Sequence, residues 1–135
     1  MAMNLRRRFA TNAQAELEGA WVELGEEAAI RVARYNNPRH KALRDRLLRP
    51  YRGLLLAGRD LPEDVEERVA IDCLAETILL DWRGVTDEKG DPLPYDRETA
   101  RGLLSSLRDF RETVAWHALQ AETFRVAEVE AIAKN

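Results

Sequence analysis

Residues 75–95 read AETILLDWRGVTDEKGDPLPY, and this stretch sets an apolar helix against a polar reversal of the chain. Ala75, Ile78 and Trp82 recur at steps of three and four residues, which is the spacing of one helix face. The apolar pattern stops at Gly84. The sequence therefore predicts a helix that ends here and a reversal that follows it.

The residues after Gly84 have the composition of an ordered loop. Gly90 and the aspartates and prolines around it supply turn geometry and leave little to bury. Trp82 and Tyr95 are placed to hold the two ends of the loop against a core, and Asp96 is placed to cap the next helix. We expect a helix, an ordered loop and a second helix.

Composition favours one soluble domain over residues 1–135. The chain is 45% hydrophobic, and a chain of this size buries roughly 70% of the surface that its unfolded form exposes. Cys73 is the single cysteine, which excludes an internal disulfide and predicts a buried core residue in a reducing cytoplasm. The longest aliphatic run, Leu54–Ala57, is far shorter than the about 20 residues that span a bilayer, so we expect no membrane segment.

Charge is distributed unevenly along the chain. Residues 1–59 hold 12 Lys and Arg against 6 Asp and Glu, whereas residues 60–135 hold 9 against 18. We expect the two halves to pack against each other with complementary surfaces, and the alternative is a basic patch that binds a partner. The formal net charge of −3 gives no overall bias toward nucleic acid or membrane.

A small β-hairpin is predicted over about residues 20–33. Trp21, Ile30 and Val32 suggest alternating burial, and Gly25 lies at the turn between the two segments. A lone hairpin is marginal in water, so it must dock on helices or pair with another chain. Its free edge is therefore one place where copies of the protein could associate.

The rest of the chain, about residues 37–133, predicts a helical body of about four to five helices. Asn37 followed by Pro38 is a helix start, and Pro50 should break that helix. The fold class is mainly α, within the α+β class. Residues 39–52 carry a face rich in arginine, and the alternative function is a small nucleic-acid-binding or regulatory protein that uses this segment. Because no aromatic residues interleave with these charges, we consider nucleic acid the weaker interpretation.

No catalytic, cofactor or metal constellation is evident in the sequence. The two histidines, His40 and His117, and the one cysteine lack the spacing of a zinc site. The acidic loop does not fit an EF-hand, because placing Gly90 at the sixth position puts Val85 at the first, which needs a carboxylate. No glycine-rich phosphate loop is present. We expect a protein that is not an enzyme and needs no cofactor.

The order of these features resembles the tail assembly chaperones of long-tailed bacteriophages and prophages. The matching residues are the hairpin with Trp21 and, above all, residues 76–96, ETILLDWRGVTDEKGDPLPYD. This segment is similar to the family's helix, Trp-x-Gly-Val turn, Asp-x-x-Gly loop and Pro-Tyr segment before the next helix. The motif residues are structural: Trp21, Trp82, Gly84, Gly90, Tyr95 and Asp96.

The resemblance implies a non-enzymatic protein with two partners. It would coat the tape measure protein, help tail tube subunits polymerise around it in the host cytoplasm, and be absent from the finished virion. Such a chaperone needs exposed apolar surface, because burying that surface is worth about 25 cal/mol per Å². The candidate partner-binding residues are Leu54, Leu55, Leu56, Trp116 and Phe124, the last two assigned to a helix over residues 110–124.

Many genes of that family also make a longer product by ribosomal frameshifting. Residues 133–135, Ala-Lys-Asn, can be encoded as GCA AAA AAC, which contains a slippery run. The hypothesis is that this chain is the short product of such a gene.

Overall fold

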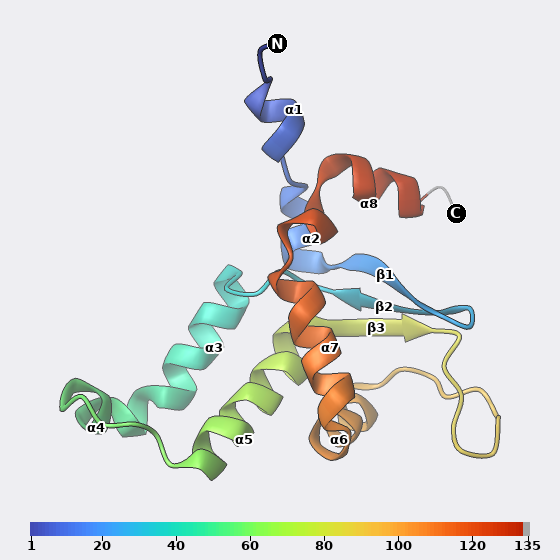
Figure 1. The fold of residues 1–135 in the computed structure, drawn as a ribbon. Coiled ribbons are helices and arrows are strands. Elements are labelled where there is room, and N and C mark those ends of the chain that lie inside the picture. Colours follow the sequence, from blue (N-terminus) through green and yellow to red (C-terminus); the bar gives the residue numbers. More distant parts are fainter. Residues whose placement is uncertain (134–135) are drawn as a thin grey trace.

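A computed structural model describes residues 1–133, in which a three-stranded sheet is surrounded by short helices (Figure 1). The strands are β1 (Ala20–Gly25), β2 (Ala28–Val32) and β3 (Leu79–Arg83). The α-helices are α1 (Leu5–Phe9), α2 (Ala13–Glu18), α3 (Pro38–Leu48), α4 (Arg52–Leu56), α5 (Glu63–Cys73), α6 (Arg97–Ser106), α7 (Arg108–Leu119) and α8 (Val126–Ala133). Shorter helical turns are η1 (Arg49–Tyr51), η2 (Leu74–Ile78) and η3 (Ala121–Phe124). The predicted class, mainly helical α+β, is confirmed.

The predicted hairpin is confirmed, and a third strand covers one of its edges. Strands β1 and β2 pair antiparallel, with Ala20 opposite Val32, and β2 pairs antiparallel with β3, with Ile30 opposite Trp82. The turn is formed by Glu26 and Glu27, which both have positive φ, as in the type I′ turns that match the twist of a hairpin. The hairpin thus docks within its own chain, and β1 keeps a free edge.

The predicted helix through residue 82 is wrong at its end. The helix α5 widens into a π-turn, η2, and then continues directly as the strand β3. In η2 the hydroxyl of Thr77 donates to the carbonyl oxygen of Cys73 at 2.7 Å, a bond that competes with regular helical pairing. Backbone pairing with β2 then favours the extended form over the helical spacing of the apolar residues.

Apolar side chains form two cores. The main core joins the sheet, η2 and the helices α6 and α7, and its fully buried members include Ile30, Ile78, Leu104 and Phe124. A smaller core lies between α3 and α5 and consists of Leu43, Val65, Val69 and Cys73. Burial confirms Cys73 as a core residue and raises the pKa of its thiol to about 11, so the thiol is protonated at neutral pH.

The loop after β3 is pinned as the sequence predicts. The indole N–H of Trp82 donates to the carbonyl oxygen of Leu93 at 2.7 Å, and the hydroxyl of Tyr95 donates to that of Leu79 at 2.9 Å. The two rings meet edge to face with centroids 5.1 Å apart. Asp96 caps α6 by accepting the backbone N–H of Thr99 at 2.7 Å, which lowers the pKa of its carboxyl.

Two helix breaks divide the helical body further than its sequence pattern indicates. The helix α3 ends before Pro50, as expected, and η1 and α4 follow. The helix predicted over residues 110–124 is wrong, because α7 ends at Leu119 and Gln120 is extended, with φ −82° and ψ 118°. The turn η3 then directs Phe124 back into the main core.

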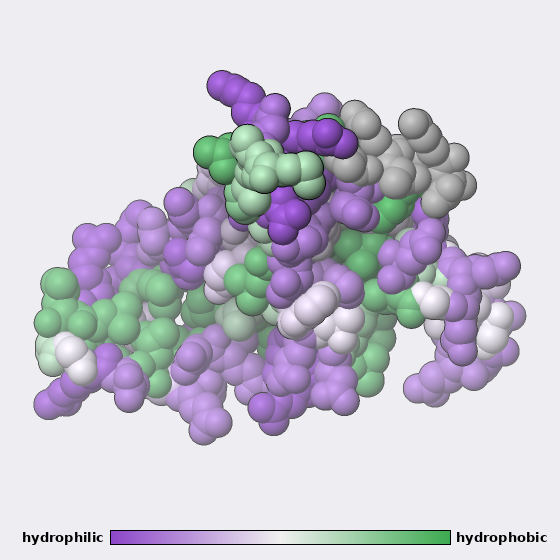
Figure 2. Space-filling view, turned by 45° about the horizontal axis from the view of Figure 1, so that its top comes forward, coloured by the Kyte–Doolittle hydropathy of each residue, from purple (hydrophilic) through white to green (hydrophobic). Residues whose placement is uncertain are grey.

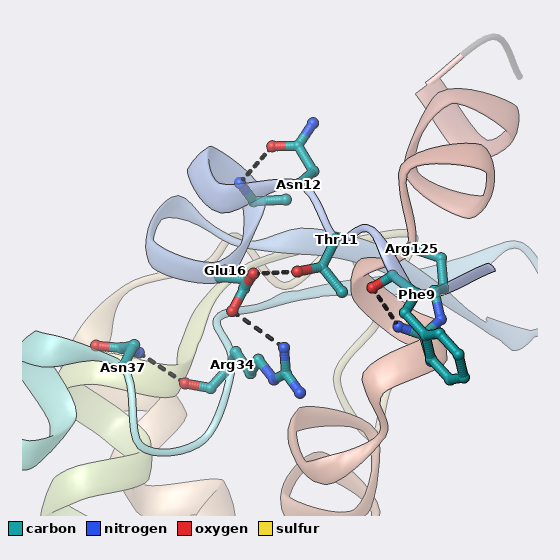
Figure 3. Close-up of polar contacts among 8 residues, drawn as sticks. Phe9, Thr11, Asn12, Glu16, Arg34, Asn37 and Arg125 are labelled. Atoms are coloured by element: carbon teal, nitrogen blue, oxygen red, sulfur yellow. Dashed lines mark hydrogen bonds and ion pairs between the residues drawn. The ribbon is translucent and has the colours of Figure 1, made fainter. Parts of the chain in front are cut away.

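A polar strap ties the N-terminal segment to the rest of the fold (Figure 3). Glu16 accepts the hydroxyl of Thr11 at 2.5 Å and the guanidinium of Arg34 at 3.2 Å. The N–H of Asn12 donates to the carbonyl oxygen of Phe124 at 2.7 Å, and Arg125 donates to that of Phe9 at 2.9 Å. These bonds hold α2 between the end of β2 and η3.

Candidate functional site

The helix α4 carries the most exposed of the predicted partner-binding leucines. Leu54 is half-buried, whereas the side chains of Leu55 and Leu56 are 41% and 81% exposed. The helix ends at Leu56, and Gly58 just after it has φ +73° and donates its N–H to the carbonyl oxygen of Leu55 at 3.0 Å. The three leucines therefore lie on a short, well-terminated helix, and we call them the α4 tip.

The smaller core positions the α4 tip away from the body. It fixes α3 against α5, with Leu47, Leu48, Tyr51 and Leu61 packed around it. Asn37 begins α3 by accepting the N–H groups of Arg39 and His40 at 2.9 and 3.0 Å. The pair α3–α4 projects from the sheet, and apolar side chains gather at its end (left in Figure 2). Exposed apolar surface at the end of a projecting element is available to a partner.

The structure separates the other two predicted partner-binding residues from the α4 tip. Trp116 lies on α7 with its side chain 58% exposed and its ring edge to face with that of His117. Phe124 has no exposed surface and packs inside the main core. Trp116 is accessible as it stands, whereas Phe124 is available only if the core opens.

A second apolar surface, missed by the sequence analysis, lies beside the loop after β3. It is a groove of about 830 Å³, lined by apolar side chains of the sheet and of α6 and α7, with loop residues at its rim. Its apolar lining includes Ile30, Trp82, Leu103, Leu107 and Phe110. This surface, which we call the loop groove, could not be found from spacing because three separate segments form it.

The rim of the loop groove is acidic and held in place. Asp87, Glu88 and Asp91 lie along it, with Lys89 among them. The carboxylate of Asp87 accepts the N–H groups of Lys89 and Asp91 at 2.8 and 3.0 Å, and the N–H of Leu93 donates to the carbonyl oxygen of Val85 at 2.9 Å. The bonded loop thus presents fixed negative charge beside an apolar floor. Among residues 1–133, no group of three His, Cys, Asp or Glu could hold a metal ion.

The basic face of α3 and of the two turns that follow it is exposed, with two exceptions. Arg39, Lys41 and Arg46 on α3, Arg49 on η1 and Arg52 on α4 are exposed, whereas Arg44 is half-buried and His40, assigned to the same face by the sequence pattern, is buried. The ring of His40 packs on that of Tyr35 with centroids 4.3 Å apart, and its Nδ1 accepts the N–H of Asn36 at 3.3 Å. The exposed basic side chains of this face are therefore all lysine and arginine.

Ion pairs of the described residues do not join the basic half of the chain to the acidic half. Arg34 pairs with Glu16 in the first half. In the second half, Arg101 pairs with Asp72 and Glu76, Arg108 with Glu112, and Arg111 with Glu67. These ion pairs leave the expectation of complementary charged surfaces a prediction, and the contacts between the halves include apolar packing between α3 and α5 and within the main core.

Burial of His40 predicts a pH-dependent stability. Desolvation, and then the nearby charge of Arg44, lower the pKa of His40 in the folded chain below its usual 6.5. Below about pH 6.5 the unfolded chain binds a proton that the folded chain resists, so stability falls with pH until the folded pKa is reached. We expect the urea concentration at the unfolding midpoint to decrease as the pH is lowered from 7.5 to 5.5. The decrease should be smaller in His40→Gln. An equal slope in both chains would contradict this assignment.

Fold and surfaces together define a mainly helical α+β domain whose candidate sites are apolar patches with charged surroundings. No helix in the described part of the chain has the length and apolar character needed to cross a membrane. The sequence model of the family described as YdaY prophage protein matches residues 35–135. The chain therefore belongs to the YdaY prophage protein family. No curated protein and no solved structure matches it. The family confirms the prophage origin that the resemblance implied.

Proposed function

We propose that this prophage protein is a tail assembly chaperone. It binds the tape measure protein, promotes assembly of tail tube subunits around it in the host cytoplasm, has no enzymatic activity, and leaves before the virion is complete. The observation that carries the proposal is the α4 tip, an exposed apolar patch that lies outside both cores. Prophage family membership and the motif of residues 76–96 support the same role.

The chemistry of the α4 tip suits a long helical client. A tape measure protein in its helical form presents apolar side chains that aggregate unless they are covered. Leu55 and Leu56 can cover such side chains without unfolding of the chaperone, because both are already exposed. Trp116, on α7, offers a second contact of the same kind.

Substituting the α4 tip tests the proposal. In Leu55→Gln/Leu56→Gln we expect the free energy of client binding to weaken by about 3 kcal/mol, since burying one leucine is worth about 1.5–3 kcal/mol. That is roughly a 100-fold loss of affinity, measured by co-expression that keeps the prophage's own tape measure protein soluble and by titration of the purified pair. The control Leu119→Gln changes an exposed leucine on α7. Full client solubility with the double variant, at unchanged fold stability, would contradict the role of the α4 tip.

A second candidate function uses the basic face of α3. In the part of the chain that the structure describes, no ion pair includes a residue of the segment 39–52. The positive charges of this segment are therefore available to phosphate groups. A nucleic-acid-binding protein would show affinity for DNA that falls steeply with salt and drops in Arg46→Gln/Arg49→Gln. The chaperone proposal expects neither effect.

The frameshift hypothesis concerns Lys134 and Asn135, which lie outside the described residues. We propose that the ribosome can change reading frame at the codons of these two residues. Sequencing the gene tests this hypothesis. If the codons of these two residues do not allow the tRNAs to pair again after a shift of one nucleotide, the longer product is excluded.

A further inference from the structure

We propose that the loop groove binds the N-terminal segment of a second copy of this chain, so that the protein associates head to tail. The segment, residues 1–8, is called the arm. This inference rests on the arm and the groove alone, and does not depend on the chaperone assignment.

The arm is apolar and basic at once. All of its residues are exposed, including Met3 and Leu5. Arg6, Arg7 and Arg8 follow directly, and no acidic side chain in the described part of the chain forms an ion pair with them. Asn4 caps the short helix by accepting the N–H of Arg7 at 3.0 Å. The arm therefore presents ordered apolar and positive groups that its own chain leaves uncovered.

The loop groove has the complementary character. Its floor is apolar, and its rim carries Asp87, Glu88 and Asp91. Its volume of about 830 Å³ lies within the roughly 300–1,000 Å³ of pockets that hold ligands. Met3 and Leu5 would fill the floor while the three arginines face the acidic rim. Charge of opposite sign on the two surfaces guides the encounter and sets its orientation.

The position of the arm favours a second copy over its own chain. Phe9, which follows the arm, is held by Arg125. The guanidinium of Arg125 donates to the carbonyl oxygen of Phe9 at 2.9 Å, and its central carbon lies 5.4 Å from the centroid of the Phe9 ring. This clamp is at the end of the sheet where β1 begins, whereas the groove is at the opposite end, beside the last residue of β3. Figure 1 shows α1 and the loop after β3 on opposite sides of the molecule.

A competing position exists on the same chain. A recess between the arm and α8 is lined by Glu122 and Glu128, and also by the three arginines. No ion pair of the described residues bridges that recess. The arm could therefore move out of this recess without breaking an ion pair. The rim of the loop groove has three acidic side chains, against two in the recess.

The geometry of the contact determines the kind of assembly. Arm and groove are different surfaces, so the contact is heterologous, and a single contact leaves one copy with a free groove and the other with a free arm. Such contacts give rings where the rotation closes and open chains where it does not. A symmetric dimer with two arm-to-groove contacts is the smallest closed form.

The first test measures association of the full chain by sedimentation and light scattering at low salt. We expect mass to rise with concentration, and Met3→Asn/Leu5→Asn to lower the association constant roughly tenfold or more, as burial of one leucine predicts. The control Leu119→Asn changes a similarly exposed leucine, 57% against 65% for Leu5, outside the contact and should leave association unchanged. A wild-type chain that stays monomeric at millimolar concentration overturns the proposal.

The second test exchanges the charges. One variant reverses the arm (Arg6→Glu/Arg7→Glu/Arg8→Glu), and the other reverses the rim (Glu88→Lys/Asp91→Lys), leaving the structural Asp87 in place. Each variant alone should be monomeric, because its arm and its rim carry charge of the same sign. A mixture of the two should associate, because the acidic arm of one variant meets the basic rim of the other, and the unchanged arm of the second meets the unchanged rim of the first. If the arm variant loses stability but associates as well as wild type, the arm lies on its own α8 and the proposal fails. A mixture that stays monomeric also overturns it.

Discussion

Gly84→Ala is expected to destabilise the folded protein by about 2–6 kcal/mol. Gly84 has φ +68°, and a Cβ placed there would overlap the carbonyl oxygen of Glu27 in the hairpin turn. Backbone strain costs about 1–3 kcal/mol, and forcing extra volume into a packed contact costs about 1–3 kcal/mol more. Because the neighbour is backbone, it cannot rotate away.

Gly90 provides a matched control for this substitution. It has φ +86°, and no atom outside Gly90 and its two chain neighbours lies within 4 Å of a Cβ built there. Gly90→Ala should cost only the backbone strain, about 1–3 kcal/mol. Urea unfolding of both variants at constant m-value measures the difference. Equal losses would show that Gly84 matters for its φ alone and that the contact with the hairpin turn is relaxed in solution.

Phe124→Ala is expected to cost about 3–5 kcal/mol, because the side chain is completely buried and its removal leaves a cavity. Trp116→Ala, at a larger but mostly exposed side chain, should change stability by no more than about 0.5 kcal/mol. Thermal unfolding of the two variants measures both effects. A small loss for Phe124→Ala would mean that η3 is not fixed in the core.

The same pair tests which of the two residues can contact a partner. We expect Trp116→Ala to affect client retention without affecting the fold. Phe124→Ala should affect the fold first, so a loss of client binding in that variant would not identify a contact. Comparing both variants at a temperature where each is folded separates the two effects.

Sequence reasoning predicted the loop at residues 84–95 better than the element before it. Turn residues act locally, so Gly84, Gly90 and Asp96 could be placed without knowledge of the rest of the fold. The conformation of Leu79 and Trp82 could not be predicted in this way, because it is extended only through pairing with β2, about fifty residues earlier in the chain. The apolar spacing correctly predicts helical structure up to Ile78. From Leu79 onward, pairing with β2 determines the extended conformation.

The binding surfaces show the same division. Exposure of Leu55 and Leu56 follows from a short helix closed by local signals, Pro50 and Gly58. Phe124 fitted one continuous stripe with Phe110, and only the extended Gln120 separates them. The loop groove had no signal in the sequence, since it depends on residues 24–30, 82–93 and 103–110 coming together.

The strap between the N-terminal segment and η3 has a consequence for synthesis. Phe9 and Arg125 are 116 residues apart in sequence, and ribosomes add roughly 5–20 residues per second. The segment that carries the arm therefore waits roughly 6–23 s after it is made before the residues that clamp it exist. Nascent chains on neighbouring ribosomes of one messenger RNA therefore carry unclamped arms close together before the later helices of the fold have been made.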